Sequence, residues 1–234
     1  MIDSNLVRSL TAAALLCSGV TAQGGFIDAL SSLTLTDVTT SGSATIEFDG
    51  AFYTGAAIVN DTSGLADFDF FFGATPDSAL ATFGANTAFA SADEDGSDAT
   101  AIVGDSGDAL ASGAAELDFT VDGTGEVTLT FAAILSATFV DAGPDAYAQA
   151  SAVVYDVFGG LEELFLFADG TSDATTAMLT LTLDVDGLAF GFLGIETGAF
   201  ADTGVAAVVP LPAAGWLFLG GLAGLTGLRR RRCA

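Results

Sequence analysis

The chain has 234 residues, a mean hydropathy of +0.59 and a formal net charge of −25 at pH 7. Its 30 acidic residues face five basic residues and no histidine. Such a charge repels nucleic acid and anionic lipid headgroups, so we expect neither among the partners of the protein.

Residues 1–22 have the pattern of a secretory signal peptide. One arginine precedes an apolar stretch at 10–20, and Val20-Thr21-Ala22 is a small-residue cleavage site at the end of the range. A lipoprotein anchor at Cys17 is disfavoured, because Leu16 stands where such an anchor needs Gly, Ala or Ser. We therefore expect the chain to be exported.

The body of the chain, 23–208, has no cationic side chain that could pair with its carboxylates. All basic residues lie outside it, at Arg8 and Arg229–Arg232, and so do both cysteines. The fold must therefore depend on a hydrophobic core rather than on disulfides. Bound cations or high ionic strength should relieve the repulsion between its carboxylates.

Apolar and polar residues alternate with a period of two in many short stretches of this body. Leu179 and Leu181, for example, alternate with Thr180 and Thr182. This pattern is typical of half-buried antiparallel strands. The predicted strands are 34–39, 44–48, 52–59, 66–72, 85–92, 117–121, 127–131, a segment around Phe139, 148–158, 164–168, 179–185 and 188–200.

Turn signals separate these strands. They are Asp49-Gly50, Asp95-Gly96, Asp122-Gly123, Gly143-Pro144, Asp169-Gly170 and Asp186-Gly187. The pattern predicts an all-β fold, a single antiparallel β-sandwich of jelly-roll type at 23–200. The 19 phenylalanines should supply most of its bulky core. We expect 93–113 to be a long loop and 201–208 to be a linker.

The body lacks the side chains of most catalytic sites. Without histidine, lysine, arginine or cysteine it cannot form a Ser-His-Asp triad, a Cys-His pair, a Schiff base or a His-ligated zinc site. Asp105-Ser106-Gly107 and Asp202-Thr203-Gly204 are similar to the paired triplets of aspartic proteases, but chance produces such triplets in a chain rich in Asp and Gly. Glu162 and Glu163 should point to opposite faces of a strand, so they cannot form a glycosidase pair. We expect no enzymatic activity.

Calcium is the cofactor that the acidic residues could bind. Asp93, Asp95 and Asp98 lie close together in a Gly-rich stretch. Calcium takes roughly six to eight oxygen ligands, and closely spaced carboxylates can supply several of them. The spacing is not that of an EF-hand. The alternative, which we favour, is an acidic solvated surface without a specific metal site.

The last 26 residues contain three segments in order. The motif Val209-Pro210-Leu211-Pro212-Ala213 should be extended, because proline fixes φ and disfavours helix in the preceding residue. The uncharged stretch 213–228 should form a transmembrane helix of about 24 Å, shorter than a hydrocarbon core of about 30 Å. The cluster Arg229, Arg230, Arg231 and Arg232 should stop transfer and stay in the cytoplasm.

This tail, 209–234, resembles the VPLPA-CTERM sorting signal, a variant of the bacterial PEP-CTERM signals. The resemblance covers the tail alone, and all five motif positions fit. It implies recognition by an exosortase, a multi-pass cysteine transpeptidase of the inner membrane that is thought to cut near the motif. The precursor would then be anchored in the inner membrane before it reaches the cell surface or the extracellular space.

Together these features predict an exported cell-surface or extracellular-matrix protein with a structural or adhesive role. The alternative is a secreted carbohydrate-binding or calcium-binding module associated with exopolysaccharide, since the resemblance implies that such systems accompany exopolysaccharide production. Exposed aromatic side chains would favour glycan binding. The only tryptophan, Trp216, lies in the predicted membrane helix, which counts against it.

Overall fold

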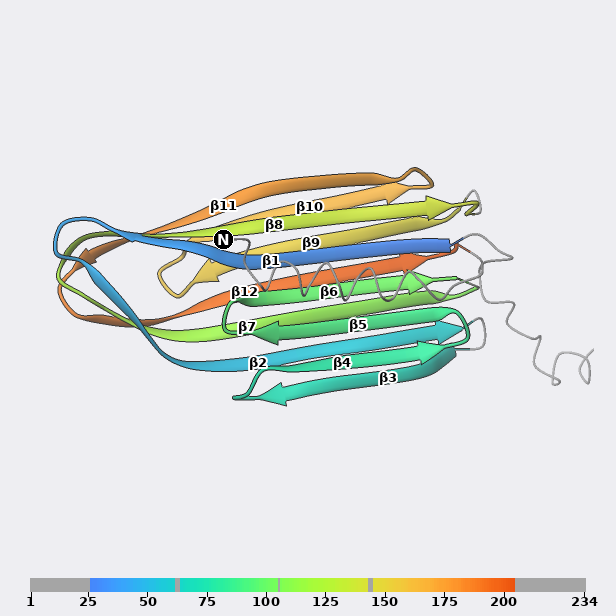
Figure 1. The fold of residues 1–234 in the computed structure, drawn as a ribbon, viewed down its shortest axis with the longest axis horizontal. Coiled ribbons are helices and arrows are strands. Elements are labelled where there is room, and N and C mark those ends of the chain that lie inside the picture. The colour runs from blue at the N-terminus through green and yellow to red at the C-terminus, as the bar shows by residue number, and fades with distance from the viewer. Residues whose placement is uncertain (1–25, 62–63, 105, 143–144, 205–234) are drawn as a thin grey trace, which may run out of the picture.

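A computed structural model describes residues 26–61, 64–104, 106–142 and 145–204. These residues form two six-stranded antiparallel sheets packed as a sandwich (Figure 1), so the predicted all-β sandwich is confirmed. The strands are β1 (Phe26–Thr40), β2 (Thr45–Asp61), β3 (Gly64–Gly73), β4 (Asp77–Phe83), β5 (Asn86–Asp93), β6 (Gly96–Val103), β7 (Asp108–Asp122), β8 (Thr124–Val140), β9 (Tyr147–Asp156), β10 (Leu161–Asp169), β11 (Asp173–Asp186) and β12 (Ala189–Asp202). The predicted signal peptide and the sorting tail lie outside the described residues.

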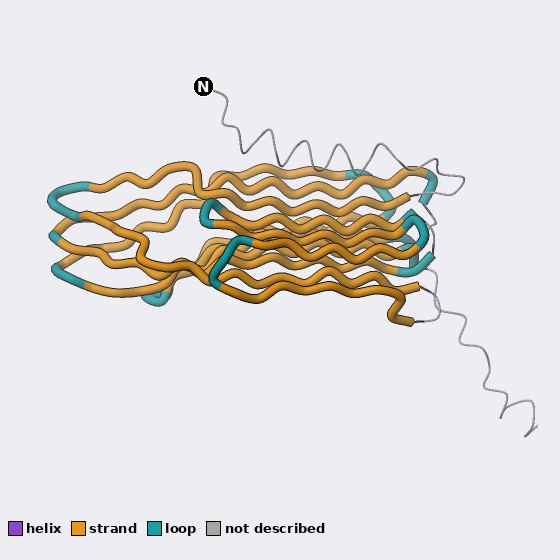
Figure 2. The backbone as a smooth tube through the Cα atoms, turned by 60° about the horizontal axis from the view of Figure 1, so that its bottom comes forward, coloured by secondary structure: helices purple, strands orange, loops and turns teal. Residues whose placement is uncertain are grey.

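The chain crosses repeatedly between the two sheets. Sheet A has the order β11-β8-β1-β6-β5-β4, and sheet B has the order β10-β9-β12-β7-β2-β3. Figure 2 shows the strands running alongside one another, with the connections gathered at the ends of the strands. Each side of the sandwich is therefore bordered by two edge strands, β3 and β4 on one side and β10 and β11 on the other.

Four of the predicted turns connect strands where expected. Asp95-Gly96 joins β5 to β6, and Asp122-Gly123, Asp169-Gly170 and Asp186-Gly187 join strands of different sheets. Gly123 has φ +97°, and a Cβ there would lie 2.1 Å from the carbonyl oxygen of Ser43, so glycine is required. The pair Asp49-Gly50 is not a turn but a bulge within β2, where the register shifts between Phe48 and Gly50. Gly143-Pro144 lies outside the described residues.

The prediction of a long loop at 93–113 is wrong, because β6 and the first part of β7 occupy most of it. The inward positions in this stretch are small residues such as Ala99, Ala101, Ala109 and Ala111, all fully buried. Alanine carries too little hydrophobic signal to mark a strand by periodicity. The unpredicted strand β4 has the same composition, and β12 continues two residues beyond the domain end predicted at 200.

Alanine, and not phenylalanine, dominates the core of one half of the sandwich. In sheet A the register sets Ala29, Ala101, Ala88 and Ala81 side by side across four strands. Of the phenylalanines in the described ranges, only Phe71, Phe119 and Phe131 are buried, so the prediction of a phenylalanine core is wrong. Bulkier residues fill the other half, including Val127, Leu129, Leu183, Leu117 and Val121.

Small inward residues let the two sheets approach closely. Cα atoms of β6 lie within 8 Å of Cα atoms of β12 and β7 in the opposite sheet, whereas packed sheets are usually about 10 Å apart. A Cβ on Gly113 would lie 2.6 Å from the carbonyl oxygen of Ser91 across the interface. The hydroxyl of Ser31 donates across the same interface to the carbonyl of Ser151 at 2.5 Å. This half of the sandwich therefore tolerates little increase in side-chain volume.

Candidate functional site: the aromatic face of sheet B

Aromatic side chains gather on the outer face of sheet B. Phe68, Phe70 and Phe72 of β3 are 57%, 66% and 75% exposed. At the opposite edge of the sheet, Phe165 and Phe167 of β10 are 61% and 53% exposed. Large exposed apolar surfaces of this kind mark interaction sites in soluble proteins. We call this surface, with the further aromatic residues Phe52, Tyr147, Tyr155, Phe190, Phe192 and Phe200 on the same side of the sheet, the aromatic face.

The rings of this face contact one another. Phe68 and Phe70 are stacked with centroids 6.5 Å apart, and Phe52 meets Phe72 edge to face at 4.5 Å. At the β10 edge of the same face, Tyr147 stacks on Phe167 at 6.1 Å. Such contacts restrict the ring orientations and stabilise the face by about 0.5–1.5 kcal/mol per pair.

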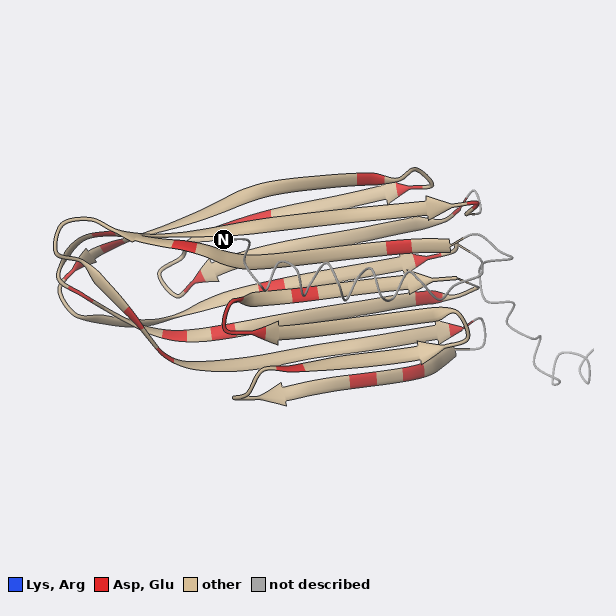
Figure 3. Cartoon of the chain, in the orientation of Figure 1, with Lys and Arg blue, Asp and Glu red and all other residues tan. Residues whose placement is uncertain are grey.

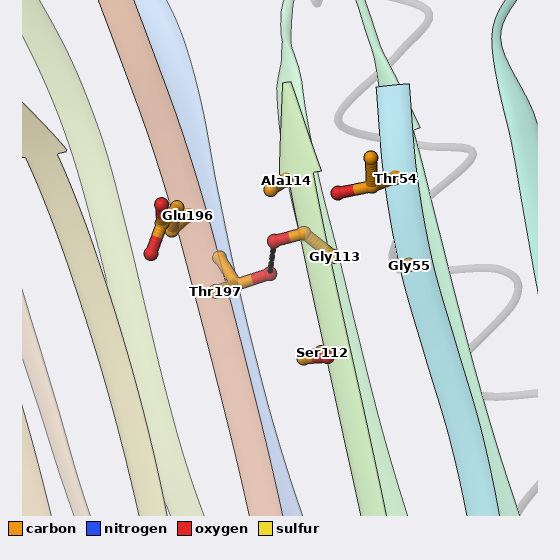
Figure 4. Close-up of a pocket in the computed structure, with 7 residues that line it drawn as sticks. All are labelled: Thr54, Gly55, Ser112, Gly113, Ala114, Glu196 and Thr197. Carbon is orange, nitrogen blue, oxygen red and sulfur yellow. Dashed lines mark hydrogen bonds between the residues drawn. The ribbon is translucent and has the colours of Figure 1, made fainter. Parts of the chain in front are cut away.

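Between the two groups of rings the surface of the aromatic face is recessed, because its side chains are small. The strand register forms one row across sheet B, in the order Phe70, Ala56, Ser112, Gly198, Ser151 and Phe165. Small residues therefore occupy the middle of the row and a phenylalanine stands at each end. Figure 4 shows the pocket in this region, about 250 Å³ in volume, lined by Thr54, Gly55, Ser112, Gly113, Ala114, Glu196 and Thr197. We call it the trough.

One carboxylate of the trough is held by a tyrosine. The phenol of Tyr155 donates to Oε1 of Glu196 at 2.8 Å, while its ring covers Gly194, where a Cβ would lie 2.3 Å from ring atom Cζ. Burial and this hydrogen bond raise the pKa of Tyr155 to about 12. At the floor, the hydroxyl of Thr197 donates to the carbonyl of Gly113 at 3.5 Å. The trough thus presents hydroxyl groups and one oriented carboxylate between aromatic rings.

Two aspartates close the edge formed by β3 and β4. Asp67 Oδ1 accepts from the N–H of Phe68 at 3.0 Å, and its Oδ2 accepts from the N–H of Thr82 at 2.8 Å. Asp69 likewise binds the N–H of Phe70 at 2.9 Å and that of Leu80 at 3.1 Å. Each carboxylate therefore accepts one hydrogen bond from a backbone N–H of β3, the edge strand of sheet B, and one from a backbone N–H of β4, the edge strand of sheet A. We call this the sealed edge.

The carboxylates are spread over strands and turns of both sheets (Figure 3). Of the residues predicted to bind calcium, Asp93 uses Oδ1 to accept from the N–H groups of Asp95 and Gly96 in the β5–β6 turn, both at 3.0 Å. Asp98 lies on β6 between Ser32 and Ser91; burial raises the pKa of its carboxyl, against a hydrogen bond with Ser32. Within the described ranges, no three acidic side chains lie close enough together to hold a metal ion. The calcium site stays a prediction.

The two triplets similar to those of aspartic proteases come together only in part. The N–H of Gly107 donates to the hydroxyl of Thr203 at 3.2 Å, but Asp105 lies outside the described residues. Asp202 at the end of β12 accepts from the N–H of Gly204 at 2.8 Å, which caps the turn. Glu162 and Glu163 are exposed on β10 and point to opposite faces, as expected.

The aromatic face was not predicted from the sequence, although a signal for it was present. In β3 the phenylalanines Phe68 and Phe70 alternate with Asp67 and Asp69. Period two indicates a strand but does not tell which of its faces is buried. Since apolar residues are usually buried, the expectation placed the phenylalanines inside.

Comparisons with protein-family models, with curated proteins and with solved structures found no match for this chain. In the described part of the chain no helix could span a bilayer. The motif Val209–Ala213, the stretch 213–228 and the arginines Arg229–Arg232 lie outside that part.

Proposed function

We propose that the protein is an exported structural or adhesive component of the cell surface or extracellular matrix, processed by an exosortase, whose aromatic face makes the adhesive contact. The observation that carries the adhesive role is the exposure of Phe68, Phe70 and Phe72 on one face. The order of motif, apolar stretch and Arg229–Arg232 in the tail supports sorting from an inner-membrane precursor. In this proposal the sandwich is of jelly-roll type and lies between an N-terminal signal peptide and a C-terminal membrane helix.

Adhesion can be tested by replacing Phe68, Phe70 and Phe72 with serine in one variant. These rings are mostly exposed, so the sandwich should stay folded while retention on apolar or cell-derived surfaces falls severalfold. The matched control replaces Met178 and Ile134, exposed apolar residues of sheet A, with serine. Equal retention of both variants and the parent protein would refute the assignment of adhesion to the aromatic face.

Sorting can be tested by the intact mass of the exported protein. A product that ends near Val209–Ala213 is expected, because the prolines hold the recognised segment extended. Replacing Pro210 and Pro212 with alanine should leave the precursor uncut in the inner membrane. An exported product that still carries Arg232 would contradict processing by an exosortase.

Glycan binding is the second candidate, and the trough favours it. Sugars stack on aromatic rings and bind hydroxyl and carboxylate oxygens, and the trough offers Glu196, Thr54 and Ser112 between rings. A glycan-array screen separates the two candidates. Binding that is lost in Glu196→Gln but kept in the serine variant of β3 would favour a glycan site over an apolar adhesive face.

A further inference from the structure

The second edge of the sandwich, formed by β10 and β11, differs from the sealed edge. The N–H of Asp156 donates to the carbonyl of Gly160 at 3.1 Å, so these two residues are a hydrogen-bonded pair. The N–H and C=O groups of the even-numbered residues of β10 therefore point toward β9. By strand alternation, the N–H and C=O groups of Glu163, Phe165 and Phe167 point away from sheet B. We call the edge formed by β10 and β11 the open edge.

Little covers the backbone of the open edge. Asp173 accepts from the N–H of Ala174 at 2.8 Å at the start of β11. Among the residues that the structure describes, no side chain hydrogen-bonds to the outward N–H groups of β10. An unprotected edge strand is a template for pairing with another strand.

We propose that β10 pairs antiparallel with β10 of a second copy of this chain, with Phe165 opposite Phe165 across the two-fold axis. This register pairs the whole strand from Leu161 to Asp169, and it sets Glu163 opposite Phe167. The free backbone groups of the two strands then face each other, and no two carboxylates are directly opposite. A shift of the axis to Leu166 would set Glu163 opposite Asp169, which like-charge repulsion disfavours.

A second copy fits this edge because the pairing continues the aromatic face. Phe165 and Phe167 already lie on the outer face of sheet B, at the end of the rows that begin with Phe70 and Phe68. Pairing would join two aromatic faces into one sheet surface and add one aromatic cross-strand pair, Phe165 opposite Phe165. The net charge of the chain opposes the contact, so association should strengthen as salt increases. This inference does not depend on the proposed adhesive or sorting roles.

Disulfide trapping in the full chain tests the proposal. With Cys17 and Cys233 changed to serine, Phe165→Cys should form an intermolecular disulfide under mild oxidation in high salt. The hydrogen-bonded pair would have Cα atoms about 5.5 Å apart, within the disulfide range of roughly 4.4–6.8 Å. Phe70→Cys is the matched control, since Phe70 is as exposed as Phe165 but lies on the sealed edge. Equal dimer yields from the two variants, or none from Phe165→Cys, would overturn the proposal.

The register is tested by mixing two variants. Glu163→Cys mixed with Phe167→Cys should give a mixed dimer, whereas Glu163→Cys alone should give little, because its two copies would be four residues out of register. Phe165→Glu should weaken self-association measured by sedimentation about tenfold, through like charges at the axis. Phe70→Glu should leave it unchanged. A similar loss in both glutamate variants would contradict pairing through β10.

Discussion

The two edges of the sandwich are built from different side chains, and this difference determines which edge can accept a strand. At the sealed edge the inward positions of β4 include Ala79 and Ala81, while on β3 Asp67 and Asp69 turn inward next to the buried Phe71. The small residues leave room for the carboxylates to reach the free N–H groups of the neighbouring strand.

At the open edge most of the buried inward positions are leucine. Leu166 of β10 and Leu179 and Leu181 of β11 are buried between the sheets. These side chains stabilise the core by about 1.5–3 kcal/mol each, but they cannot accept hydrogen bonds from the edge. The sealed edge thus buries less apolar surface but has backbone N–H groups bound by carboxylates. The open edge buries more apolar surface and leaves the outward N–H groups of β10 without such partners among the described residues.

The largest change in stability is expected where the seal depends on close sheet packing. Gly113→Val would force atoms against the carbonyl of Ser91, separate the sheets and draw β3 away from β4. We expect a loss of about 3 kcal/mol in the free energy of unfolding. Urea unfolding of the purified protein measures it. Gly73→Val is the control, because a Cβ at Gly73 meets nothing within 4 Å. An equal loss of stability in both variants would show that valine lowers the free energy of unfolding through backbone entropy alone and not through a steric clash.

Removing the seal should have the next largest effect. The double variant Asp67→Ala, Asp69→Ala frees four backbone N–H groups, and exposed hydrogen bonds of this kind contribute a total of about 2 kcal/mol. The variant should also self-associate through β3 and β4, which is not expected of the parent. Asp184→Ala, which removes an exposed carboxylate from β11, is the control for the loss of negative charge. Unchanged unfolding and sedimentation in the double variant would mean that the aspartates do not protect this edge.

These edges also show how far the sequence could predict the molecule. Leucine–threonine alternation at 179–185 predicts β11 correctly, because a bulky apolar residue at every second position marks both the strand and its buried face. β4 and β6 were missed, because alanine and serine or aspartate alternate with little contrast in hydrophobicity.

The candidate site was harder to predict, because at β3 the usual association between apolar residues and burial is reversed. Asp67 and Asp69 turn inward since they find N–H groups of β4, and this turns Phe68 and Phe70 outward. The hydrogen-bond partners lie on another strand, 11 and 15 residues further along the chain. A pattern within one strand contains no information about them.

Cations should affect both the stability of the fold and pairing at the open edge. High salt should raise the free energy of unfolding by about 1 kcal/mol through screening and should also favour pairing at the open edge. Thermal melts in sodium, magnesium and calcium at matched ionic strength, with sedimentation in the same buffers, measure the two effects. A shift specific to low calcium would support a site at Asp93, Asp95 and Asp98, and no shift with any cation would refute destabilisation by the carboxylates.

The smallest effect concerns Tyr155, which lies opposite Leu161 at the start of the open edge. Its pKa of about 12 in the folded protein exceeds the ordinary value of 10.0. Between these two pH values the folded protein keeps a proton that the unfolded chain has lost, so this contribution to stability is complete below pH 10.0 and disappears as pH rises toward 12. Tyr155→Phe should therefore lose less stability than the parent over this window, as measured by urea unfolding at each pH. Phenol absorbance should show one late-titrating tyrosine fewer in the variant. Identical pH profiles for the two proteins would mean that burial and the hydrogen bond to Glu196 do not hold the phenol in its neutral form.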